Sequence, residues 1–202
     1  MRGTLYGSLT SPYARITRIV RELSGASGLI AFEVADPFDE GYRRINPLGK
    51  VPALILDTGP QLLETGLIAR VLMQLGGTDL LPEDELARIQ AEADLALIIG
   101  VLDLGVAAFL ETRRPQTERS EPWLQRRLKG IETALPLVDA AARRHAGDPD
   151  GLAAAAIAVT GDWLSFRLAD SIGWRAGAPA AAALADGLLA GEIFAATDPR
   201  SA

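Results

Sequence analysis

Three short polar motifs in the first third of the chain hold the residues that are best suited to chemistry. They are Ser11-Pro12, the run Asn46 to Pro52 (Asn-Pro-Leu-Gly-Lys-Val-Pro), and Glu64-Thr65. A serine at a helix start can hydrogen-bond an anion, a Val-Pro pair before a strand can offer its backbone to an extended peptide, and a Glu-Thr pair can hold an amino acid's ammonium and carboxylate. No single motif is specific, but their order and spacing favour a site for a small thiol peptide.

Ser11 and Pro12 match the start of a helix. Proline suits the first helical position and serine suits the N-cap before it, so a capped helix without further function is one interpretation. In the other, the hydroxyl and the positive end of the helix dipole stabilise an anion. Lowering a thiol pKa of about 8.5 by about two units takes roughly 2.7 kcal/mol, which a charge-assisted hydrogen bond and a helix terminus can supply.

The loop that ends at Pro52 also has two interpretations. It is either a turn into a strand, or a ligand edge in which the Val51-Pro52 bond is cis, an isomer found at about one X-Pro bond in twenty. We then expect the Val51 N–H and C=O to pair with a ligand backbone as an added antiparallel strand. Lys50 lies beside that edge, where its ammonium would meet a terminal carboxylate.

Glu64-Thr65 is either a plain N-cap pair or the recognition point for a free amino-acid end. In the second case the Thr65 hydroxyl and N–H bind a carboxylate at the helix N-terminus, and Glu64 accepts a hydrogen bond from an ammonium.

Strand and helix patterns alternate over the first eighty residues. They predict a small α/β unit of the thioredoxin type, residues 1–80, with Arg15 on the outer face of its first helix. The expected strands start at Thr4, Leu29, Val51 and Gln61, and the expected helices are Pro12 to Ser24 and Thr65 to Leu75.

After a linker at residues 81–86, the chain is predicted to be helical over residues 87–202. Apolar residues recur at three- and four-residue spacing from Leu95 to Phe109, Leu124 to Val138 and Leu152 to Phe166, with a further helix from Pro179 to Leu189. The fold class is therefore α/β plus all-α. Asp94 and Asp103 are either buried or pocket-facing acids that interact with substrate, or lie on solvated faces, and we expect the second. We also expect His145 at a solvated helix end. Arg113-Arg114 fits either an anionic electrophile or the negative end of a helix dipole.

Composition excludes several kinds of site. The 202 residues include no cysteine and one histidine, so disulfides, thiolate metal sites, cysteine nucleophiles and histidine metal clusters are excluded. A net charge of −6 argues against a nucleic-acid partner. Apolar runs such as Leu152 to Thr160 are too short to span a bilayer, and no signal peptide is visible, so we expect a cytoplasmic protein with no membrane partner.

Taken together, Thr10 to Arg15, Asn46 to Pro52 and Leu63 to Thr65 resemble the glutathione S-transferase family, in particular its bacterial serine-type members that lack cysteine. The resemblance covers essentially the whole chain, including Trp163 to Arg167. It implies a thioredoxin-like domain followed by an all-helical domain that forms the electrophile pocket. It also implies a transferase that activates the thiol of glutathione, its co-substrate, for attack on a small hydrophobic electrophile without a metal.

The resemblance implies a role for each matching residue. Ser11 would be catalytic and hold the sulfur as thiolate, Val51 beside cis-Pro52 would pair with the cysteinyl backbone, and Lys50 would approach the glycyl carboxylate. Glu64 and Thr65 would hold the γ-glutamyl end, although the family usually has serine where Thr65 stands. The expected electrophile pocket includes Tyr13, Phe109 and Trp163.

Wider implications of the resemblance are a homodimer, a detoxification role and a glutathione peroxidase side activity. An alternative is a non-catalytic glutathione-binding or protein-interaction module on the same fold.

Overall fold

A computed structural model describes residues 1–201, which form two compact units. The first unit is Met1–Pro82 together with the C-terminal segment from Ala190, and the second is Glu83–Leu189. We expected that C-terminal segment in the helical domain, but it packs with the N-terminal unit.

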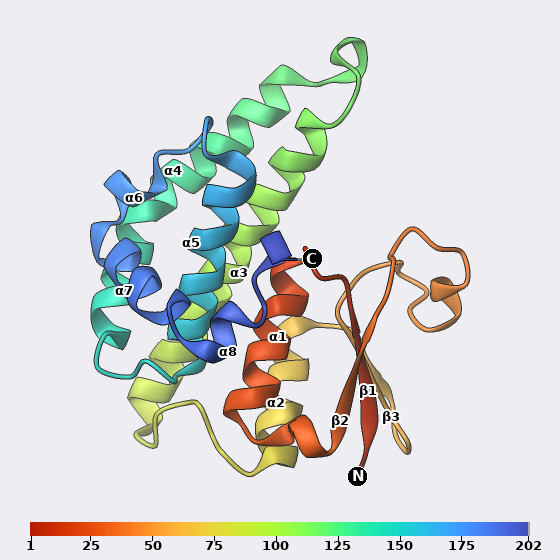
Figure 1. The fold of residues 1–202 in the computed structure, drawn as a ribbon. Helices are drawn as coiled ribbons and strands as arrows, with labels where there is room; N and C mark the ends of the chain where they lie inside the picture. Colours follow the sequence, from red (N-terminus) through yellow and green to blue (C-terminus); the bar gives the residue numbers. More distant parts are fainter. Residues whose placement is uncertain (202) are drawn as a thin grey trace. The chain divides into compact units, whose positions relative to one another are not determined.

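A four-stranded sheet organises the first unit (Figure 1). Its order is β2-β1-β3-β4, with β1 parallel to β2 and antiparallel to β3, and β3 antiparallel to β4. The strands are β1 (Gly3–Gly7), β2 (Ile30–Val34), β3 (Ala53–Leu56) and β4 (Gln61–Leu62), and the helices are α1 (Pro12–Leu23), α2 (Thr65–Gly76) and α8 (Glu192–Ala195). Figure 1 shows α1 and α2 side by side against the sheet, which confirms the thioredoxin-like prediction.

The C-terminal segment is attached to α1 by Arg15. We expected Arg15 on the outer face of the helix, and this expectation is wrong, because only 3% of the residue is exposed. Its Nη2 donates to the Phe194 carbonyl at 3.2 Å and its Nε donates to the Thr197 hydroxyl at 3.2 Å. A guanidinium can be buried where such acceptors satisfy its donors, and these acceptors lie about 180 residues further along the chain.

Helices alone build the second unit, as predicted. Its core is α5, where small alanines between Leu152 and Val159 are almost completely buried and allow close helix contacts. Helix α3 packs against α4 and α5, and α7 packs against the same two helices. The helices are α3 (Glu85–Thr112), α4 (Glu121–His145), α5 (Leu152–Leu168), α6 (Trp174–Gly177) and α7 (Pro179–Leu189).

Short 3₁₀ turns complete the secondary structure at Ala26–Gly28, Tyr42–Arg44, Gln116–Glu118 and Pro199–Ser201. Over residues 1–201, only α3 is long and apolar enough to cross a membrane, judged by length and composition. Core helices of water-soluble proteins pass the same test, and α3 contributes Ile98 and Leu102 to the core of the helical unit.

Candidate functional site

Strand register brings the three polar motifs to one end of the sheet in the first unit. Gly7, the last residue of β1, pairs with the last residue of β2, and Tyr6 pairs with Ala53, the first residue of β3. Leu54 then pairs with Leu62 of β4. Ser11 follows β1, Val51 precedes β3 and Glu64 follows β4, so all three lie at the same end.

Ser11 is the N-cap of α1. Its backbone is extended, with φ −75° and ψ 125°, and its hydroxyl oxygen accepts a hydrogen bond from the Ala14 N–H at 3.3 Å. A hydroxyl also has one proton to donate, and no acceptor for it exists within residues 1–201. The half-buried hydroxyl is therefore free to donate to an anion at the positive end of α1.

The loop before Val51 is fixed by its own side chains. Asn46 is fully buried, donates from its amide to the Lys50 carbonyl at 2.7 Å and accepts from the Leu48 N–H at 3.0 Å. The Tyr42 hydroxyl donates to the same carbonyl at 2.9 Å. Burial raises the pKa of Tyr42, so it remains a donor at neutral pH. Gly49 has φ +59°, a conformation that favours glycine.

Val51 follows this fixed loop and is half-buried. The Val51-Pro52 bond is cis, which confirms the prediction. In the part of the chain that the structure describes, neither the N–H nor the C=O of Val51 has a hydrogen-bond partner. Both groups are available to an extended ligand. Lys50 is exposed beside them.

Glu64 and Thr65 begin α2. Glu64 is its N-cap, and its two carboxylate oxygens accept from the Gly66 and Leu67 N–H groups, each at 2.8 Å. Because the carboxylate is exposed and each oxygen keeps a lone pair, it can still accept from an ammonium. Thr65 is buried, and neither its hydroxyl nor its N–H has a partner among residues 1–201.

Sequence reasoning did not assign a role to Tyr42, which steadies the loop through the Lys50 carbonyl. An aromatic residue in a polar stretch was the available signal. No group of three His, Asp or Glu side chains among the described residues is arranged to hold a metal ion.

The helical unit brings together two of the three expected electrophile-pocket residues. The Phe109 and Trp163 rings pack edge to face, with centroids 6.0 Å apart and an interplanar angle of 84°. The Arg167 guanidinium lies 5.0 Å from the Phe109 centroid and 3.9 Å from the Phe166 centroid. Burial, with the nearby charge of Arg113, lowers the pKa of Arg167. Tyr13 belongs to the other unit, in the first turn of α1.

A buried ion cluster in the helical unit corrects two predictions. Asp94 and His145, both expected in solvent, are 3% and 7% exposed. Asp94 accepts from Arg144 Nε at 3.0 Å and Nη2 at 2.6 Å, from His145 Nε2 at 2.9 Å and from Gln90 at 3.1 Å. Burial opposes ionisation, but these hydrogen bonds outweigh it and hold the pKa of Asp94 below its ordinary value. Asp103 is exposed, as expected.

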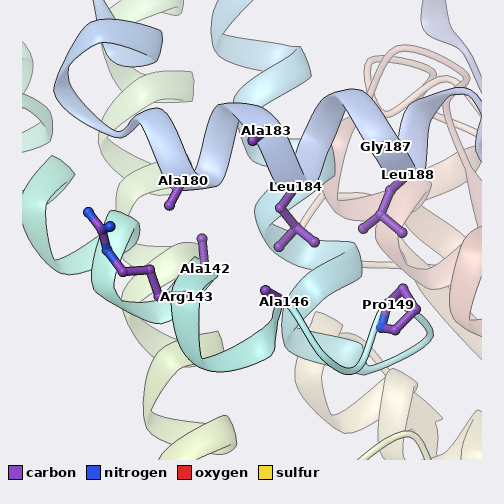
Figure 2. A pocket seen from close by; sticks show the side chains of 9 residues that line it. All are labelled: Ala142, Arg143, Ala146, Pro149, Ala180, Ala183, Leu184, Gly187 and Leu188. Carbon is purple, nitrogen blue, oxygen red and sulfur yellow. The ribbon is translucent and has the colours of Figure 1, made fainter.

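A groove of about 570 Å³ lies between the end of α4, the following loop and α7. Figure 2 shows α7 side chains on one side of it and α4 and loop side chains on the other. Its one charged lining residue, Arg143, is paired with Asp139. The lining residues, which provide no acid, base or nucleophile, are Ala142, Arg143, Ala146, Pro149, Ala180, Ala183, Leu184, Gly187 and Leu188.

Comparison with known proteins shows the family of this chain. Residues 5–78 match the family model described as glutathione S-transferase, N-terminal domain. The chain is 31% identical over 204 residues to the uncharacterized GST-like protein YibF of Escherichia coli (strain K12), covering 98% of this chain and 99% of that protein.

Solved structures show the same relationship. A glutathione transferase family member from Pseudomonas fluorescens Pf-5 with bound glutathione is 30% identical, with a TM-score of 0.89 and 98% of each chain covered. A glutathione S-transferase from Methylobacterium radiotolerans in complex with glutathione sulfonate is 31% identical, with a TM-score of 0.83 and coverage of 98% and 94%. With a full-length relative above 30% identity and a sheet end that carries all three motifs, this chain belongs to the glutathione S-transferase family.

Proposed function

We propose that this protein is a glutathione transferase whose Ser11 activates the glutathione thiol for attack on a small hydrophobic electrophile. One observation carries the proposal. Ser11, Val51 and Thr65 lie at the same end of one sheet, and each has a hydrogen-bonding group without a partner in residues 1–201. These groups match an anion, a peptide backbone and a carboxylate. The Pseudomonas and Methylobacterium relatives bind glutathione or its sulfonate, which supports the same ligand here.

Glutathione would be bound as a short antiparallel strand. The Val51 N–H and C=O pair with the cysteinyl backbone beside Pro52, and this pairing sets the register of the ligand. Thr65 donates its hydroxyl and N–H to the γ-glutamyl carboxylate, while Glu64 accepts from the γ-glutamyl ammonium. The exposed Lys50 ammonium attracts the glycyl carboxylate.

Ser11 then acts on the sulfur. Its hydroxyl donates to the thiolate and, together with the N-terminus of α1, lowers the thiol pKa toward neutrality. The thiolate attacks the electrophilic carbon, an S–C bond forms, and the leaving group departs with its bonding electrons or the adduct takes a proton from solvent. Phe109, whose ring packs edge to face on the buried Trp163, supplies apolar surface for the electrophile.

Family membership also supports a homodimer, a cytoplasmic location, a detoxification role and a peroxidase side activity with glutathione as reductant. No metal is required for the steps above. The second candidate, a non-catalytic glutathione-binding or protein-interaction module, predicts binding without turnover, or no binding. The free Ser11 hydroxyl favours the enzyme.

The test is calorimetric titration with reduced glutathione, followed by turnover of a neutral chloronitroaryl electrophile. We expect Ser11→Ala to bind glutathione with little loss, to lose the ultraviolet absorbance of the bound thiolate, and to react about 10- to 100-fold more slowly, since one charge-assisted hydrogen bond is removed. Ser27→Ala is the matched control, because Ser27 is exposed and precedes β2 at the opposite end of the sheet.

Absence of glutathione binding by the native protein would overturn the proposed function. Binding without any turnover would support the non-catalytic module instead. Equal thiolate absorbance and equal rates in Ser11→Ala and native protein would remove Ser11 from the catalytic role.

A further inference from the structure

Two arginines of the helical unit lie close together around Phe109. Arg113 caps the C-terminus of α3 one turn beyond Phe109, and its N–H donates to the Phe109 carbonyl at 3.3 Å, so both residues lie on the same side of the helix. Arg167 comes from α5 and places its guanidinium 5.0 Å from the Phe109 ring centroid. Burial lowers the pKa of Arg167, and the charge of Arg113 lowers it further. The Arg167 guanidinium thus lies near the Phe109 ring, and the exposed Arg113 lies one turn further along the chain from that ring.

Neither arginine has an acidic partner in residues 1–201. Their neighbours in the same unit do: Arg114 lies near Glu111 and Glu118, Arg127 pairs with Glu111, and Arg144 pairs with Asp94. Glu111, two residues before Arg113, is thus already engaged by other partners, which include the Ser120 N–H at 2.7 Å. The two carboxylates nearest to Arg113 in the sequence, Glu111 and Glu118, thus pair with other arginines.

Arg167 is held in place although it lacks an ion pair. It stacks on Phe166 at 3.9 Å and lies near Phe109, so its planar group is restrained by two rings. The residue is half-buried, which removes part of the water that would solvate its charge. A restrained, partly desolvated cation beside a second cation is unfavourable alone, and an anion that contacts both would relieve it.

We propose that Arg113 and Arg167 bind an anionic group, a carboxylate or sulfonate, on the electrophilic substrate, whose flat or apolar part lies against Phe109 and Phe166. This inference rests on the proposed function and names the substrate class of its second site. A guanidinium is suited to this task because its planar fork of donors matches a carboxylate. The enzyme is therefore expected to prefer charged electrophiles over neutral ones of the same shape.

A pair of matched electrophiles tests this preference. In 4-chloro-3-nitrobenzoate and 4-chloro-3-nitrobenzamide the glutathione thiolate attacks the ring carbon that carries chlorine, an S–C bond forms, and chloride leaves with the bonding pair of the C–Cl bond. The two probes differ at the opposite end of the ring by one charge. Each enzymatic kcat/KM is divided by the uncatalysed rate constant to remove differences in intrinsic reactivity.

We expect native protein to favour the benzoate, and Arg167→Gln and Arg113→Gln each to reduce the benzoate-to-benzamide ratio about 10-fold or more. Arg167→Lys, which keeps the charge, should retain part of the preference. Arg126→Gln is the control, because Arg126 also lies over an aromatic ring, that of Trp123, and is exposed elsewhere on α4. It should leave the ratio unaltered.

This inference is overturned if the corrected rates of the two probes are equal, or if the preference for the benzoate survives in both glutamine variants. If glutathione still binds normally, neither outcome contradicts the proposed function. Loss of glutathione binding by native protein would overturn the proposed function by itself. The anion site is then tested without glutathione, through quenching of tryptophan fluorescence by 4-nitrobenzoate against 4-nitrobenzamide. Tighter benzoate binding that Arg167→Gln abolishes supports the site, and equal binding of the two probes contradicts it.

Discussion

The free polar groups at the end of the sheet contrast with the buried Asp94 cluster in the helical unit. Asp94 accepts four hydrogen bonds, from two nitrogens of Arg144, from His145 and from Gln90. At the sheet end, the Ser11 hydroxyl proton, the Val51 peptide and Thr65 have no partner within residues 1–201. A buried polar group costs stability unless it is satisfied, so the first arrangement stabilises the fold. The second is open to a ligand.

Removal of the Asp94 charge should cause the largest loss of stability. Asp94→Asn deprives Arg144 and the buried His145 of their anion, and we expect the free energy of unfolding to fall by about 3 kcal/mol, measured by urea denaturation. Glutathione affinity should not change. Glu132→Gln is the control, since its exposed pair with Lys129 is worth little. A loss in Asp94→Asn no greater than in this control would contradict a structural role.

The same cluster predicts a dependence on pH. The pKa of Asp94 is lower in the folded protein than its ordinary value near 3.8, so the folded state favours the ionised carboxylate. The stabilisation is therefore present above the unfolded pKa and is lost as the pH falls through the folded value. The stability difference between native protein and Asp94→Asn should be constant above about pH 5 and shrink below about pH 4. A difference that grows in acid would reverse the assigned sign.

The Asp94 cluster could not be predicted from the sequence because its charged partners, Arg144 and His145, lie about 50 residues from Asp94 along the chain. Taken alone, His145 ends a helix in a charged stretch, and such residues are usually solvated. Arg15 was wrongly expected on the outer face of α1 for the same reason, since its acceptors lie in the C-terminal segment. Long-range pairing of charges leaves no periodic signal, so a charged residue that is buried by a distant partner looks like a surface residue.

The sheet end was more predictable because its signals are local. Ser11-Pro12 marks a helix start through the missing proline N–H and the capping hydroxyl, and α1 begins at Pro12. The alternation of strands and helices predicted the thioredoxin-like unit, and the alanine-rich stretch from Pro179 to Leu189 is a helix with those bounds, as expected. An N-cap pair was one interpretation of Glu64-Thr65, but the two hydrogen bonds of the Glu64 carboxylate were not predicted, because its rotamer is not visible in a sequence.

A substitution of Asn46 tests whether one buried, hydrogen-bonded side chain contributes both to stability and to glutathione binding. In Asn46→Asp the carboxylate still accepts from Leu48 but faces the Lys50 carbonyl, to which it cannot donate. We expect a loss of about 2 kcal/mol in unfolding free energy together with several-fold weaker glutathione binding, because Val51 loses its support. Denaturation and calorimetry measure the two effects. Pro47→Ala, in an exposed position of the same loop, should change neither greatly. A stable variant with native affinity would show that the loop needs no support.

Substitutions of Thr65 test whether its unpartnered hydroxyl binds glutathione. Thr65→Val keeps the side-chain shape and the backbone N–H but removes the hydroxyl, so we expect glutathione to bind about 10-fold more weakly by calorimetry, with little change in stability. Thr65→Ser, which restores the hydroxyl, should bind as well as native protein. Equal affinity of the valine and serine variants would mean that the hydroxyl makes no contact with the γ-glutamyl carboxylate.

Substitution of Lys50 should have the smallest effect on glutathione affinity. Its side chain is exposed, so its attraction for the glycyl carboxylate acts through water and is screened by salt. We expect Lys50→Gln to raise the Kd for glutathione about two- to fivefold at low ionic strength and to have almost no effect near 0.5 M salt. Lys129→Gln, which removes an exposed lysine from the helical unit, should leave the Kd unchanged at both ionic strengths. A loss in Lys50→Gln that persists at high salt would indicate a close, partly desolvated contact, and Lys50 would then belong with Ser11, Val51 and Thr65.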